Sequence, residues 1–167
     1  MNSIQLNECA QKDKILQKYF VGVFAADQLP EKKFPGAYIV NTDNSSGPGQ
    51  HWVAMFCYDH KIECFDSFGQ YPGDCNPHIS NWLDPVYQII HNRQLQSNDT
   101  SVCGQYCLFF LLLRAHGYTF EDTLSAFNRK REFNDKFVQK FVNRWFRVST
   151  SLRDKHFFIQ QQLHGNL

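Results

Sequence analysis

Apolar runs of strand length dominate the first half of the chain. The run from Tyr19 to Ala26 (YFVGVFAA) indicates a short extended segment, and AYIVNT, which starts at Ala37, is typical of a buried strand. Residues 51–58 (HWVAMFCY) and 61–68 (KIECFDSF) flank the pair Asp59-His60, which suits a tight turn. These two runs therefore predict a β-hairpin, preceded by a loop in the Gly- and Pro-rich stretch before it.

Helical patterns lie toward the two ends of the chain. Phe133, Phe137, Phe141 and Trp145 recur every four residues, which predicts an amphipathic helix with these rings in the core. The helices that we expect cover residues 2–18, 76–91, 102 onward, 119–127 and 133–146, and residues 93–100 form a polar loop. Strands in the middle and helices at both ends make this an α+β protein.

Size and composition favour one folded domain over residues 1–167. A hydrophobic share of 43% and an aromatic share of 16% exclude a disordered chain, and we find no repeat or linker. The first residues, MNSIQLNECAQKDK, lack the apolar centre of a signal peptide, and the longest apolar stretch, Cys107–Leu113, is too short for a membrane span. We therefore expect a soluble, intracellular protein without a membrane partner.

Positive charge gathers at the C-terminal end although the whole chain carries only +1. From Arg129 onward there are nine basic and three acidic side chains, so this part carries about +6 and the rest about −5. Such a basic face is either a solvated helix surface or a contact for nucleic acid or an acidic partner. The candidate DNA contacts are Arg129, Lys130, Arg131, Lys136, Lys140 and Arg144.

The segment NDTSVCGQYCLFFLLLRAHG places Cys103 where a polar loop enters an apolar helix. Unpaired amides and the positive end of the helix dipole stabilise a thiolate there, whereas Cys107, one turn deeper, is buried and inert. Cys103 is thus either a nucleophile or a structural thiol. Gly104 would let another chain approach the backbone closely. The six cysteines form no paired C-x-x-C motifs, so we expect neither a zinc site nor any other metal.

A cysteine nucleophile needs an imidazole, and His51 is the candidate because it begins a strand directly after a loop. If Asp59-His60 is a two-residue turn, Asp66 shares a face with His51 and lies diagonally across the hairpin from it. Asp66 is then either the group that orients the imidazole or an ordinary strand-end carboxylate facing water. The other histidines are expected at the surface: His60, His78, His91, His116, His156 and His164.

A tetrahedral intermediate also needs hydrogen-bond donors for its oxyanion. The backbone amide of Cys103 is available by position, and Gln96, seven residues earlier, can offer a side-chain amide. Gln94 and Gln105 are alternatives that local chemistry alone does not exclude.

Four motifs in this order, GQHWVAMF, CFDSFG, QSNDTSVCG and the helix that follows, resemble the adenovirus proteases (adenains), as do FPG and AYIVNT earlier. The resemblance runs from about Tyr19 to Trp145. It implies a mixed central sheet packed against a central helix that carries the nucleophile. It also implies roles for individual residues: His51 as base, Asp66 as its partner, Cys103 as nucleophile, Gln96 and the Cys103 amide as oxyanion hole, and Trp52 and Gly104 as support.

The same order of residues occurs in ubiquitin-like-protein (SUMO) proteases and in adenain-like proteases of Maverick/Polinton transposons. The resemblance therefore implies a cysteine endopeptidase acting on viral or transposon precursor polypeptides, often after glycine; a deubiquitinase or deSUMOylase, or a non-enzymatic binding module, are the alternatives. Activation by DNA or a viral peptide would follow, yet residues 77–94 lack the cysteine that adenains use to bind their peptide. No organic cofactor is expected. A monomer in the host nucleus and virion is the expected state.

Overall fold

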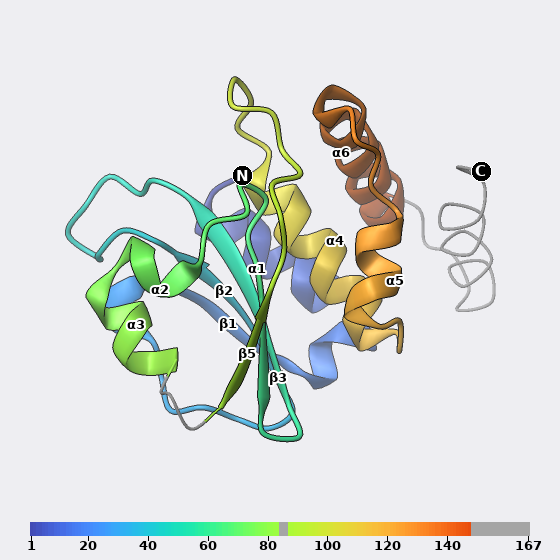
Figure 1. Ribbon diagram of the computed structural model, residues 1–167. Helices are drawn as coiled ribbons and strands as arrows, with labels where there is room; N and C mark the ends of the chain where they lie inside the picture. Colours follow the sequence, from blue (N-terminus) through green and yellow to red (C-terminus); the bar gives the residue numbers. More distant parts are fainter. Residues whose placement is uncertain (84–86, 148–167) are drawn as a thin grey trace.

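The computed structural model describes residues 1–83 and 87–147 and contains one mixed, five-stranded sheet (Figure 1). Its strands, in spatial order, are β1 (Phe20–Ala25), β2 (Gly36–Asn41), β3 (Trp52–Tyr58), β4 (Lys61–Phe65) and β5 (Gln88–His91). The three central strands are antiparallel, and each edge strand is parallel to its neighbour. The α+β prediction is thereby confirmed.

Helices cover both faces of this sheet (Figure 1). They are α1 (Ser3–Lys12), η1 (Leu16–Lys18), η2 (Ala26–Gln28), α2 (Pro72–Cys75), α3 (Pro77–Leu83), α4 (Cys103–Ala115), α5 (Phe120–Ser125) and α6 (Arg131–Arg147). One core joins the sheet to α1, α4, α5 and α6, and a smaller one joins the opposite face to η2 and α3. Both faces of the central strands are consequently apolar and buried, which explains their continuous hydrophobic sequence.

The predicted hairpin is present with the predicted turn. Asp59 and His60 both have positive φ, 43° and 57°, as a two-residue type I′ turn requires. Tyr58 therefore pairs with Lys61, and Ala54 pairs with Phe65. Continuing this register brings the residue after β4, Asp66, next to the start of β3.

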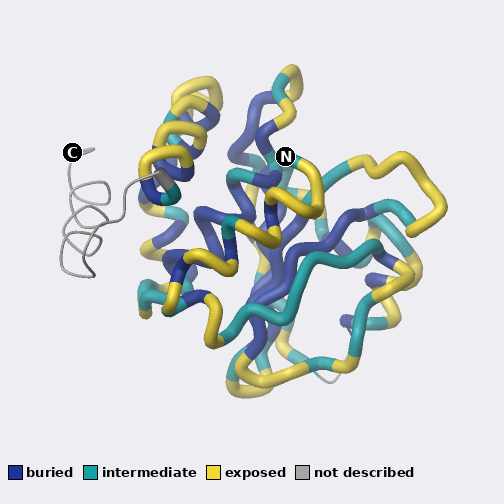
Figure 2. The backbone as a smooth tube through the Cα atoms, turned by 180° about the vertical axis from the view of Figure 1, so that it is seen from behind, coloured by how far each residue is buried: buried dark blue, intermediate teal, exposed yellow. Residues whose placement is uncertain are grey.

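Helix α4 runs through the middle of the molecule, and buried residues gather there in Figure 2. Ten of its thirteen residues are buried, because it packs against β3 on one side and α6 on the other. The stacked rings of Phe65 and Phe110, 4.7 Å apart, join helix to sheet. The central helix that the resemblance implied is thus the element from which Cys103 projects.

Two predicted helices are shorter in the structure. Helix α1 ends at Lys12, because the Asp13 carboxylate accepts hydrogen bonds from the amides of Ile15 and Leu16 and starts the separate turn η1. The predicted helix over 76–91 is present as α3 up to Leu83 and is wrong over residues 88–91, while residues 84–86 lie outside the described part of the chain. Residues 88–91 instead pair with β4, since Ile89 and Ile90 find apolar neighbours at the sheet edge.

Helices α5 and α6 confirm the C-terminal predictions, with two corrections of burial. Phe141 and Trp145 are buried, but Phe133 is 58% exposed, since it lies in the first turn of α6, beyond the core. His116, expected at the surface, is fully buried and lies 3.2 Å from the carboxylate of Asp13. His156 and His164 lie outside the described residues, as does the end of the predicted domain, 148–167.

Candidate active site

The structure brings together the three residues that the sequence singled out as a nucleophile, a base and its partner. Nε2 of His51 lies 2.6 Å from Oδ1 of Asp66, across the open end of the hairpin. Because Nε2 is taken by Asp66, Nδ1 is the ring nitrogen that remains to interact with the Cys103 side chain, and each of these two groups shifts the pKa of the other. A loop, a strand end and a helix start thus converge, each contributing one side chain.

Cys103 is the first residue of α4, and its thiol is poised to ionise. Burial raises the pKa of Cys103, but hydrogen bonds from His51 and from the Trp52 and Gly104 amides, together with the charge of His51, lower it below the ordinary value. Cys107 has no such partners, and burial raises its pKa well above that value. The two cysteines therefore differ chemically, as predicted.

The pKa of the His51 imidazole is shifted in the opposite direction to that of this thiol. Burial alone would lower the pKa of His51, but the hydrogen bonds and charges of Asp66 and Cys103 outweigh burial and raise that pKa to about 9. The Phe68 ring packs against the imidazole, with centroids 4.8 Å apart. The lowered pKa of Cys103 and the raised pKa of His51 both shift the balance of the pair toward thiolate and imidazolium.

Asp66 is held rigidly by backbone groups. Its Oδ1 also accepts a hydrogen bond from the Phe68 amide at 2.8 Å, and its Oδ2 accepts one from the Gln70 amide at 3.2 Å. The side chain of Asn92 grips the Asp66 main chain, accepting from its N–H at 3.0 Å and donating to its carbonyl at 2.7 Å. The sequence analysis missed Asn92, since no local pattern connects a residue after β5 to the end of β4.

Gln96, the predicted oxyanion donor, is fully buried in the loop that leads to Cys103. Its Nε2 donates to the Thr100 carbonyl at 2.6 Å, and its Oε1 accepts from the Ser67 hydroxyl at 2.6 Å. The same Nε2 also lies 3.3 Å from the Thr100 hydroxyl, and Gln96 is not among the residues that line the cleft beside Cys103. Its role as an oxyanion donor therefore stays a prediction. The alternatives are placed differently: Gln94 is bonded to Asn98, and Gln105 lies on α4, lining a pocket beside α1.

Trp52 and Gly104, predicted as support, both contact the start of the chain. The Trp52 indole donates to the Met1 carbonyl at 3.1 Å. A Cβ on Gly104 would lie 3.0 Å from Leu6 Cδ2 and 3.4 Å from Met1 Cβ. The close approach that glycine permits is therefore made within the same chain, by Leu6 of α1 and by Met1.

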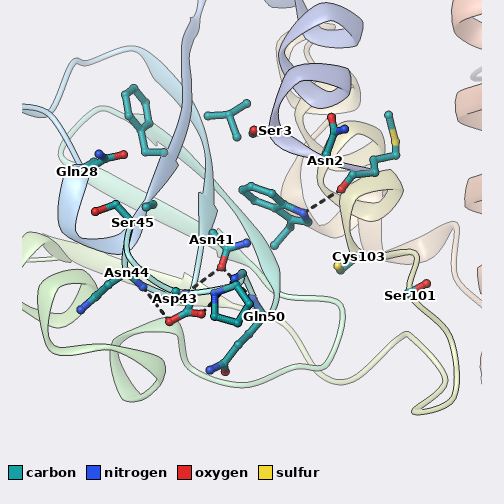
Figure 3. Close-up of a pocket in the computed structure, with 18 residues that line it drawn as sticks. Asn2, Ser3, Gln28, Asn41, Asp43, Asn44, Ser45, Gln50, Ser101 and Cys103 are labelled. Atoms are coloured by element: carbon teal, nitrogen blue, oxygen red, sulfur yellow. Dashed lines mark hydrogen bonds between the residues drawn. The ribbon is translucent and has the colours of Figure 1, made fainter.

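Cys103 lies at one end of a cleft of about 720 Å³ (Figure 3). One wall consists of Met1, Asn2 and Ser3, and another is the 43–50 loop with Asn41. Carboxamides and hydroxyls dominate the labelled lining, and Val23, Phe24 and Ala25 of β1 also line the cleft. This shape accommodates an extended polypeptide beside the sulfur.

The remaining predicted residues are apart from this cleft. The six candidate DNA contacts, Arg129, Lys130, Arg131, Lys136, Lys140 and Arg144, are exposed on α6 and the turn before it. DNA contact by these side chains stays a prediction. Across residues 1–83 and 87–147, no group of three or more His, Cys, Asp or Glu could hold a metal ion. Of the helices that the structure describes, none has the length and apolar character needed to cross a membrane.

The fold of this chain is similar to that of solved structures of a viral cysteine protease. The chain matches the crystal structure of selenomethionine-labelled African swine fever virus pS273R protease with a TM-score of 0.58, covering 89% of this chain and 68% of that one, at 21% identity. A second crystal structure of that protease matches with a TM-score of 0.54. At this identity the likeness shows a shared fold.

Sequence relatives are of the same kind. The chain is 30% identical over 129 residues to cysteine protease S273R of African swine fever virus (isolate Tick/Malawi/Lil 20-1/1983), covering 66% of this chain and 43% of the relative. The counterpart in isolate Tick/South Africa/Pretoriuskop Pr4/1996, named SUMO-1 cysteine protease S273R, matches equally. Putative thiol protease R355 of Acanthamoeba polyphaga mimivirus is 29% identical over 111 residues, covering 59% and 36%. No family model matches, and the chain spans less than half the length of these relatives.

Proposed function

We propose that this chain is a cysteine endopeptidase of the viral type, with Cys103 as nucleophile. The observation that carries the proposal is the relay from Asp66 through His51 to Cys103, at the head of a cleft that fits a peptide. The names of the relatives, which are cysteine or thiol proteases, agree with it.

The chemistry follows from the positions of the three side chains. The Cys103 thiolate attacks the peptide carbonyl, and the His51 imidazolium then gives its proton to the leaving amine. Asp66 holds the ring by Nε2 and stabilises its charged form, so that Nδ1 stays directed at sulfur. The Cys103 amide, in the first turn of α4 and therefore without an intrahelical acceptor, donates to the oxyanion together with Gln96. Neutral His51 finally activates the water that releases the acyl group.

The test compares Cys103→Ala with Cys75→Ala on a peptide library that includes sites with small residues such as glycine. Both thiols are partly exposed, but burial raises the pKa of Cys75, so this thiol is the matched control. We expect cleavage to be lost in Cys103→Ala and kept in Cys75→Ala, with both variants folded. Cleavage by Cys103→Ala would refute the proposal.

A second candidate, removal of SUMO or a related modifier, is suggested by relatives named SUMO-1 cysteine protease. A SUMO or ubiquitin probe with a reactive C-terminus would label Cys103 efficiently under this alternative, whereas an endopeptidase for precursor polypeptides would prefer the peptide library. A non-enzymatic module would leave Cys103 no more reactive to iodoacetamide than an ordinary thiol. Adding duplex DNA to the cleavage assay tests whether the exposed cations of α6 take part.

A further inference from the structure

The loop between β5 and α4 is anchored to the end of β4 on one side. The amides of Leu95 and Gln96 both donate to the Ser67 carbonyl, at 2.8 and 2.9 Å, and the Ser67 hydroxyl bonds the Gln96 side chain. Because Ser67 directly follows Asp66, these bonds fix the loop relative to the carboxylate that faces His51.

Helix α6 holds the same loop from the opposite side through Asp135, which is only 4% exposed. One carboxylate oxygen accepts hydrogen bonds from the Ser97 amide at 3.2 Å and the Thr100 hydroxyl at 3.0 Å. The other accepts from the Tyr106 hydroxyl at 2.9 Å. All three donors are neutral, and a carboxylate is the side chain that can accept from all of them at once.

Asn134, the neighbour of Asp135, reinforces this contact. Its side-chain amide donates to the Leu95 carbonyl at 3.0 Å, and the Tyr106 hydroxyl reaches the same carbonyl at 3.1 Å. Asn134 and Asp135 of α6 therefore hold the loop at Leu95, Ser97 and Thr100.

The bonds of Asp135 lead directly to the predicted oxyanion donors. Thr100, which donates to Asp135, presents its carbonyl to the Gln96 side-chain amide at 2.6 Å. Three residues later the chain reaches Cys103, whose backbone amide is the other donor. The positions of both donors therefore depend on where Asp135 holds Thr100.

We propose that Asp135 is a positioning residue for the oxyanion hole, acting through Thr100 on Gln96 and on the start of α4. This inference rests on the proposed cysteine protease function. Asp135 does not touch the cleft, so its role is to keep the donors in place as charge develops on the substrate oxygen. Asp135 makes no hydrogen bond to the His51–Asp66 pair, which is held by Asn92 and by the amides after Asp66.

The experiment uses Asp135→Asn, which keeps one acceptor oxygen but turns the other into a donor facing Ser97 and Thr100. Thr100→Val, which removes a single donor, is a milder second variant should the first fail to fold. Glu132→Gln makes the same chemical change at an exposed position of α6 and serves as the matched control. Four quantities are compared: kcat and KM on a cleaved peptide, the affinity of the corresponding peptide aldehyde, and the rate of Cys103 alkylation by iodoacetamide against pH.

We expect kcat to fall about 10- to 100-fold in Asp135→Asn with KM little changed, since complete loss of one oxyanion donor typically costs about 10²–10³-fold. Aldehyde affinity should fall in parallel, because its tetrahedral adduct uses the same donors. The alkylation profile should stay as in the wild type, since alkylation forms no oxyanion. Thr100→Val should show the same pattern more weakly, and Glu132→Gln should show none of it.

Two results would overturn the inference while leaving the protease itself intact. One is unchanged kcat and aldehyde affinity in a folded Asp135→Asn variant; the other is a loss of alkylation in proportion to kcat, which indicates general damage to the site. Failure of the proposed function looks different, because wild-type protein would then neither cleave peptides nor bind the aldehyde.

Discussion

Replacing Asp66 with asparagine tests most directly whether this carboxylate stabilises the charged form of His51. The carboxylate accepts a hydrogen bond from His51 Nε2 at 2.6 Å and is almost fully buried, so the asparagine side chain would enter a similar space. Its amide oxygen can still accept a hydrogen bond from the His51 N–H, but the side chain no longer carries a negative charge. The variant therefore separates electrostatic support of the imidazolium from simple orientation of the ring.

The structure sets the size of the expected effect. The His51 pKa rises from 6.5 to about 9 despite burial, through the hydrogen bonds and charges of Asp66 and Cys103. At 1.36 kcal/mol for each pKa unit, this difference is about 3 kcal/mol in favour of the imidazolium. We assign most of it to the buried carboxylate, which predicts a loss of about 2–3 kcal/mol, or roughly 30- to 150-fold in kcat at neutral pH.

The pH profile carries the same information with a definite sign. Wild-type activity should rise as Cys103 ionises and fall as His51 loses its proton near pH 9. Without the carboxylate, the imidazolium is less stable, so the alkaline limb should move toward lower pH. The measurement is the initial rate on a cleaved peptide between pH 5 and 10.

Asp27→Asn is the matched control, because this carboxylate also accepts a backbone hydrogen bond, from Ser45, yet has no contact with His51. Its profile should equal that of the wild type. An Asp66→Asn variant that is folded, keeps wild-type kcat and still loses activity only near pH 9 would refute the electrostatic role.

Three further predictions concern stability, each measured as the free energy of unfolding in urea. Gly104→Val should cost about 1–3 kcal/mol, because the added methyl groups would press α4 against α1. Phe141→Ala should cost about 3–5 kcal/mol, whereas Phe133→Ala should change stability by less than about 0.5 kcal/mol; equal losses would contradict the assigned burial. Arg114→Met should cost about 3–5 kcal/mol, since it leaves the buried Glu63 carboxylate without its cation, and adding Glu63→Gln should recover part of the loss.

Local sequence patterns were sufficient for the hairpin and the nucleophile helix. The two-residue turn at Asp59-His60 fixes the register, and strand alternation then places Asp66 on the face of His51. Cys103 was identified in the same way, because the transition from polar to apolar residues marks a helix start. Both inferences depend on neighbours in the chain.

Other parts depend on contacts between distant segments. Residues 88–91 have a helical pattern but form β5, because the edge of β4 offers backbone partners that no local pattern reveals. His116 is buried by α1 and α6 rather than by its own surroundings in sequence. The hydrogen bond between Asn92 and Asp66 joins residues 26 positions apart in the sequence, and the one between Asp135 and Thr100 joins residues 35 positions apart.

The sequence by itself determined the class of fold and the start of the central helix, and it placed Asp66 on the face of the hairpin that carries His51. Each of these follows from periodicity and turn chemistry over a few residues. Only the tertiary structure decided how the loop between β5 and α4 is held and which residues form the walls of the cleft beside Cys103. Such positions depend on buried polar groups finding partners from remote elements, and that requirement is met only when the whole chain packs.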